Sequence, residues 1–149
     1  NTMINSRIKI PAGAKNHQEF DTMNVKRDSL LYSVLPHAHY RGKAMEVSVI
    51  YPNGEEKILL SVPNYDFNWQ TSYDFKEPVF IPKGSKLKQI NWWDNSKQNL
   101  ANPDSSVDVY WGEQSFEEML FGAFMMRNLK EGEVVSTKTL ENYRASTEE

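Results

Sequence analysis

Two histidines have the type and spacing that a metal site needs. His37 and His39 flank Ala38, directly after Pro36. Alternate side chains of a strand lie on one face, so a strand through this segment would hold the two imidazoles about 7 Å apart at the backbone. Neutral imidazole binds copper, zinc, iron and nickel. Two ordinary surface histidines beside a proline turn would give the same pattern, so the pair leaves both interpretations open.

A methionine and a third histidine are further candidates. Met119 follows a polar segment, residues 111–118, and begins an apolar run. A thioether is a soft ligand that selects copper, particularly Cu(I), over zinc and the hard cations. Methionine is also an adaptable filler of hydrophobic cores, which is the simpler interpretation from periodicity alone. His17 follows a turn signal, where a histidine is usually solvated or bonded to backbone, so a metal role and a substrate contact stay open for it.

Other chemistry is limited by what the chain contains. The sequence has no cysteine, which excludes disulfides, zinc–thiolate sites, thiol nucleophiles and Cys-ligated copper. It also has no Ser–His–Asp order, P-loop, dinucleotide fingerprint or His-Glu-x-x-His motif. Two segments rich in aromatic and amide residues, 64–70 and 91–95, fit either a ligand cleft or core packing with satisfied Trp and Tyr polar tips; we favour core packing.

The composition is that of an ordinary globular domain. The chain has 149 residues, of which 39% are hydrophobic and 25% charged. The net charge of −3, with no concentrated basic surface, argues against a nucleic-acid partner. No apolar run approaches the roughly 18 residues of a membrane span. The N-terminus lacks the features of a signal peptide and begins with Asn1, so we expect a processed form or a fragment of a longer protein.

The elements that must position these residues are short strands between turn signals. Alternating or apolar runs predict strands at Ser6–Ile10, Ser29–Leu35, Ala44–Tyr51, Lys57–Val62, Tyr73–Ile81, Lys86–Trp93, Val107–Trp111 and Glu118–Met126. The triplet Pro52-Asn53-Gly54 predicts a hairpin turn, and residues 94–106 predict a long surface loop. This pattern predicts an all-β fold, an antiparallel jelly-roll sandwich of about eight strands. We expect one domain over residues 1–137 and a frayed or disordered polar tail over residues 138–149.

Taken together, these segments resemble a known enzyme family. The chain is similar to the C-terminal domain of the copper type II, ascorbate-dependent monooxygenases, a superfamily that includes peptidylglycine α-hydroxylating monooxygenase and dopamine β-monooxygenase, and most of all to its bacterial members. The resemblance runs from about Ile8 to about Arg127. It is carried by an ordered series of motifs: Leu35 to Lys43, Val62 to Gln70, Glu77-Pro78, Ile81 to Gly84, Asp94 to Ser96, Asn102 to Asp104 and Trp111 to Gln114.

The resemblance implies a site and a reaction. It makes His37, His39 and Met119 the ligands of one copper ion that activates O₂, with ascorbate or another reductant and an unknown small-molecule or peptide substrate. Four residues become possible contacts of the ligands or of the substrate: His17, Tyr40, Glu113 and Gln114. Leu35, Phe121 and Ala123 stand where the peptide-amidating members carry polar or basic residues, which argues against a peptidylglycine substrate. The family's second copper is held by three histidines of a preceding domain, so this chain alone is not expected to complete coupled turnover.

Three functional hypotheses follow. The leading one is the oxygen-activating copper domain of a larger extracytoplasmic (periplasmic or secreted) monooxygenase, which hydroxylates a C–H bond when joined to a second redox domain. The first alternative is a copper-binding module for storage, delivery or structure. The second is a metal-free β-sandwich that binds protein or glycan through its aromatic segments.

Overall fold

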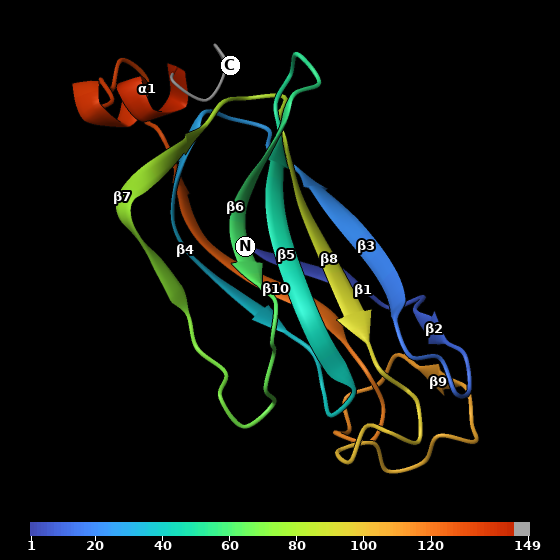
Figure 1. Ribbon diagram of the computed structural model, residues 1–149. Helices are drawn as coiled ribbons and strands as arrows, with labels where there is room; N and C mark the ends of the chain where they lie inside the picture. The colour runs from blue at the N-terminus through green and yellow to red at the C-terminus, as the bar shows by residue number, and fades with distance from the viewer. Residues whose placement is uncertain (145–149) are drawn as a thin grey trace.

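Two antiparallel four-stranded sheets face each other in the computed structural model, which describes residues 1–144 (Figure 1). One sheet has the order β1-β10-β4-β7 and the other has the order β3-β8-β5-β6, while β2 and β9 form a small two-stranded sheet. The strands are β1 (Thr2–Asn5), β2 (Lys9–Ile10), β3 (His17–Asn24), β4 (Ser29–His37), β5 (Gly42–Ile50), β6 (Glu56–Val62), β7 (Tyr73–Ile81), β8 (Lys86–Trp93), β9 (Val109–Tyr110) and β10 (Leu120–Asn128). One helix, α1 (Thr137–Arg144), follows them within the described residues.

The predicted all-β sandwich is confirmed. The strands expected at Tyr73–Ile81 and Lys86–Trp93 have the observed bounds, and the predicted turn joins β5 to β6 with Gly54 at a φ of 91°. A positive φ of this kind favours glycine, as the sequence indicates. The jelly-roll connectivity stays a prediction. Within residues 1–144, no helix has the length and apolar character that crossing a bilayer requires.

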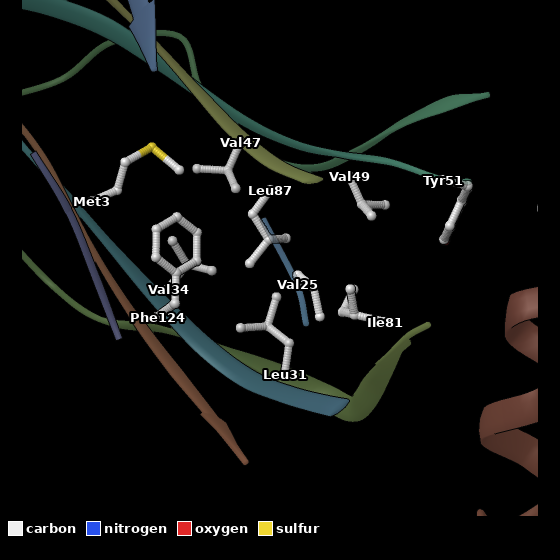
Figure 2. Close-up of a cluster of buried hydrophobic side chains, with 10 residues drawn as sticks. All are labelled: Met3, Val25, Leu31, Val34, Val47, Val49, Tyr51, Ile81, Leu87 and Phe124. Carbon is white, nitrogen blue, oxygen red and sulfur yellow. The ribbon is translucent and has the colours of Figure 1, made fainter. Parts of the chain in front are cut away.

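Side chains from both large sheets fill the space between them. Figure 2 shows this core, with β5 and β8 on one side and β4 and β10 on the other. Its buried members are Met3, Val25, Leu31, Val34, Val47, Val49, Tyr51, Ile81, Leu87 and Phe124. Each fully buried aliphatic or aromatic side chain of this kind stabilises the fold by roughly 1.5–3 kcal/mol. The core therefore fixes how β4 and β10, the strands that lead to the candidate ligands, lie against the opposite sheet.

Three expectations differ from the structure. The strand expected at Ser6–Ile10 is reduced to Lys9–Ile10, and β1 and β3 were not predicted. The half-buried positions of β3 alternate, but they include His17, Glu19 and Asp21, so the strand carries no hydrophobic alternation. At the other end, residues 138–144 of the expected tail belong to α1, where the ring of Tyr143 contacts those of Tyr51 and Phe80. The remainder of that tail, residues 145–149, lies outside the described residues.

Candidate metal centre

The three candidate ligands lie where β4 ends and β10 begins. His37 is the last residue of β4, His39 follows two residues later, and Met119 immediately precedes β10. The prediction that one strand carries both histidines is wrong, because β4 stops at His37. In Figure 1 this end of the sandwich lies at the bottom of the view, away from α1.

The register between β4 and β10 brings the end of one strand beside the start of the other. His37 is directly opposite Phe121 in the antiparallel ladder, and their ring centroids are 6.0 Å apart. Opposed residues of a ladder project to the same face, and so do residues two apart along a strand. Met119 is two residues before Phe121 and is half-buried. The ladder ends at this pair, and the backbone N–H groups of His39 and Met119, just beyond it, both donate to Oε2 of Glu118.

The two imidazoles approach each other edge to face. Their centroids are 5.1 Å apart and their planes meet at 79°. The Nδ1 of His39 is 3.2 Å from the backbone oxygen of Glu117, and the Nδ1 of His37 contacts Oε1 of Gln70. Since the oxygen accepts in both bonds, each Nδ1 donates and is fixed by its partner. Metal-binding histidines are oriented in this way in general.

The Gln70 side chain is itself oriented by a second bond. Its Nε2 donates to the backbone oxygen of Phe67 at 2.8 Å, which turns Oε1 toward His37. The Phe67 ring in turn lies 6.2 Å from that of His39. The hydroxyl of Tyr65 donates to the Ala38 oxygen at 2.7 Å. The segment 63–72 thus contacts all three residues of the His-Ala-His run.

Burial keeps the second histidine neutral. The exposed fraction of His39 is only 4%. Desolvation lowers its pKa, and the neighbouring imidazole of His37 lowers that pKa further. A neutral imidazole is the form that binds a metal ion, so the environment of His39 favours the ligating form.

A buried carboxylate organises the backbone around the ligands. Glu118 is fully buried, and its oxygens accept from the backbone N–H groups of His39 at 2.8 Å, Arg41 at 2.6 Å and Met119 at 3.3 Å, and from the indole N–H of Trp93 at 3.0 Å. Burial raises the pKa of Glu118 to about 7, against the effect of these donors. Sequence analysis did not single out Glu118, although it shares the buried face of the β10 run with Leu120.

The buried guanidinium of Arg41 joins the long loop after β8 to the segment that precedes Met119. The Nε of Arg41 donates to Oδ1 of Asn95 at 3.0 Å, and its Nη1 donates to the Phe116 oxygen at 2.8 Å. Arg41 and Asn95 are both buried. The motifs that carried the resemblance, from residues 35–43, 94–96 and 111–114, therefore meet in one region of the structure.

The remaining predicted contacts divide into two groups. Tyr40 lies beside the site, with its ring 4.7 Å from that of Phe67. Glu113 and Gln114 are exposed on the segment that leads to Met119.

His17 lies elsewhere, at the start of β3. Its Nε2 is 3.0 Å from Glu19 Oε1, and its ring contacts Trp93 at 6.3 Å. His17 follows the turn closed by the Ala14 N–H and the Pro11 oxygen, as the sequence predicts, and it pairs with Trp93 in the β3–β8 ladder.

The donor set fits a soft ion. Two imidazoles and a thioether are the ligand types that copper accepts, most readily as Cu(I), and zinc or hard cations would lack their usual carboxylate or thiolate donors here. Among residues 1–144, no group of three or more His, Cys, Asp or Glu side chains is arranged to hold a metal. The two histidines alone do not make such a group, and Met119 is the further donor that the sequence predicts.

Comparison with known proteins identifies no family for this chain. No family model matches the chain, and no curated protein matches its sequence significantly.

Proposed function

We propose that this chain holds one copper ion through His37, His39 and Met119 and serves as the oxygen-activating domain of a monooxygenase-like oxidoreductase. The observation that carries the proposal is the pair of imidazoles at 5.1 Å, each bonded at Nδ1, at the end of the ladder that leads to Met119. The resemblance of the motif series to copper type II monooxygenases supports the same site.

A copper ion in such a site supplies O₂ activation and the insertion of one oxygen atom into a C–H bond. The chain's own contribution is to orient the ligands. Gln70 and the Glu117 carbonyl hold the two rings, and Glu118 holds the backbone of His39 and Met119. Burial of His39 keeps water from one side of the site.

The reaction needs electrons from outside this domain. Hydroxylation of a C–H bond by O₂ yields the alcohol and water, and it consumes two electrons and two protons. Ascorbate or another reductant would supply the electrons through a second redox domain. We place the working protein outside the cytoplasm, and its substrate is an organic molecule with an accessible C–H bond.

An anaerobic Cu(I) titration tests the site. We expect the wild-type chain to bind one Cu(I), the His37→Ala/His39→Ala variant to bind none, and Met119→Leu to lose affinity for Cu(I) more than for Cu(II), because the thioether favours the softer ion. His17→Ala and Met125→Leu are matched controls away from the ligand set and should bind as wild type. Equal binding in all variants would remove the site, and unchanged binding in Met119→Leu alone would remove Met119 from it.

A second measurement separates oxygen activation from copper storage. The Cu(I)-loaded chain should be oxidised by O₂ within the time of a stopped-flow or manual-mixing experiment, because the three-donor site leaves coordination positions open. A storage or delivery module should retain Cu(I) in air. Retention of Cu(I) under O₂ would therefore replace the monooxygenase proposal with the binding module.

A further inference from the structure

Two amide side chains lie inside the sandwich, among apolar neighbours. Gln89 and Asn91 are on β8 and are fully buried. Gln89 Nε2 donates to Asn91 Oδ1 and to the Phe121 oxygen, both at 2.9 Å. Buried amides cost stability unless they are bonded, whereas leucine side chains there would pack without that cost. The presence of amides at residues 89 and 91 is therefore best explained by the groups to which they are hydrogen-bonded.

Asn91 reaches across the sandwich to both strands of the candidate site. Its Nδ2 donates to the backbone oxygen of His37 at 3.2 Å and lies 3.5 Å from that of Met119, at the outer limit of a hydrogen bond. His37 belongs to the sheet that faces β8, and Met119 immediately precedes β10 of that sheet. One amide group of the opposite sheet thus contacts the backbone of two candidate ligands.

These contacts occur where the β-ladder stops. Pairing of β4 with β10 ends at His37 and Phe121, so the backbone of His39 and Met119 lies beyond the last ladder pair. Glu118 joins the N–H groups of His39 and Met119. Asn91 joins the carbonyls of His37 and Met119.

We infer that Asn91 is a positioning residue that sets the spacing of His37 and Met119 and thereby the geometry of the copper site. The inference rests on the proposed function for its reference to copper, while its structural part concerns the two backbone segments alone. Residues that orient ligands without touching the ion typically change metal affinity roughly 10- to 100-fold when replaced. We expect Asn91→Leu to weaken Cu(I) binding by a factor in that range.

Ser29 provides the control. It is also polar and fully buried, it lies at the opposite end of β4 from His37, and its hydroxyl donates to the Arg27 oxygen at 2.8 Å and lies 3.0 Å from Oδ1 of Asn128. Ser29→Ala therefore removes buried hydrogen bonds, none of which involves a candidate ligand. Both variants should lose stability to urea, and only Asn91→Leu should lose Cu(I) affinity and Cu–S scattering in X-ray absorption.

The outcomes distinguish positioning from general destabilisation. If Asn91→Leu and Ser29→Ala weaken Cu(I) binding equally, or if folded Asn91→Leu binds as wild type, the inference is overturned. Asn91→Ser, which is smaller and cannot reach both carbonyls, repeats the test should the leucine variant fail to fold. If the wild-type chain binds no copper, the proposed function fails. The NMR shifts of the Met119 methyl and the His37 amide in the metal-free variants then decide the positioning role, with movement expected for Asn91→Leu and none for Ser29→Ala.

Discussion

The backbone N–H of His39 donates to Oε2 of Glu118 at 2.8 Å. The same oxygen accepts the indole N–H of Trp93 at 3.0 Å and the N–H of Met119 at 3.3 Å. A fully buried carboxylate with several donors is costly to form but is strongly held once formed, because any lost partner leaves an unsatisfied group. Glu118 therefore couples the stability of this end of the sandwich to the placement of two candidate ligands.

Replacement of Glu118 should destabilise the fold strongly. Glu118→Ala leaves the N–H groups of His39 and Arg41 and the indole of Trp93 without their acceptor, and we expect a loss of about 3–5 kcal/mol in the free energy of unfolding. Urea denaturation measures it. Glu113→Ala, at an exposed glutamate of the same segment, should change stability by no more than about 0.5 kcal/mol. Equal effects of the two substitutions would show that the buried carboxylate does not hold this region.

Loss of the Gln70 side chain should weaken the copper site without unfolding the chain. Gln70 is exposed apart from its bonds to His37 and Phe67, so Gln70→Leu should leave stability nearly unchanged. Because the ring of His37 loses the acceptor that orients it, we expect Cu(I) affinity to fall roughly 10-fold or more. Gln98→Leu, at an exposed glutamine of the loop after β8, is the control. Identical affinities for the two variants would contradict an orienting role for Gln70.

A methyl group at Gly42 should disturb the packing of Tyr65 against the histidine segment. A Cβ built there would lie 2.7 Å from Cδ1 of Tyr65 and 2.9 Å from the Cβ of Ala38. Overpacking of this kind costs about 1–3 kcal/mol, so Gly42→Ala should lower the free energy of unfolding by that amount. Adding Tyr65→Ala removes the ring that clashes, and the double variant should lose less than the sum of the single losses. If the stability loss of the double variant equals the sum of the two single losses, the close contact between Gly42 and Tyr65 is contradicted.

Acid should weaken a specific ion pair at the other end of β10. The Arg127 guanidinium bonds both oxygens of Glu133, and together with the N–H of Lys130 it lowers the pKa of Glu133 to about 2. A carboxylate whose pKa is lower in the folded state stabilises the fold above its unfolded pKa. That stability should be lost as the pH falls from 4.5 to about 2.

The comparison with a neutral variant isolates this effect. Glu133→Gln should show a smaller loss of stability than wild type over the same acidic range, measured by urea unfolding at stepped pH. Glu131→Gln removes a nearby exposed carboxylate and is the control for loss of charge. A pH profile of Glu133→Gln that overlays that of wild type would show that the pair does not contribute.

The sequence could predict the strands whose apolar residues alternate. The strand predicted at Lys86–Trp93 has the same bounds in the structure, and it places Leu87 in the core. The turn at Pro52-Asn53-Gly54 could be predicted because glycine readily adopts the positive φ that Gly54 has. β3 was missed because its half-buried face carries polar side chains, so the hydrophobic signal of a strand is absent.

The candidate site could be predicted in part. The histidine pair and Met119 stand out by residue type, but the register that brings the end of β4 beside the start of β10 is encoded by no local pattern. Glu118 and Asn91 were missed for a different reason. Charged and amide side chains are usually exposed, and the burial of these two depends on partners far away in the sequence.

X-ray absorption of the Cu(I)-loaded protein tests the central claim most directly. We predict a copper ion bound by two imidazole nitrogens and one sulfur, with the sulfur contribution lost in Met119→Leu and retained in Met125→Leu, whose methionine is exposed on β10. A spectrum of the wild-type protein without a sulfur ligand, or one that Met119→Leu leaves unchanged, would contradict the account.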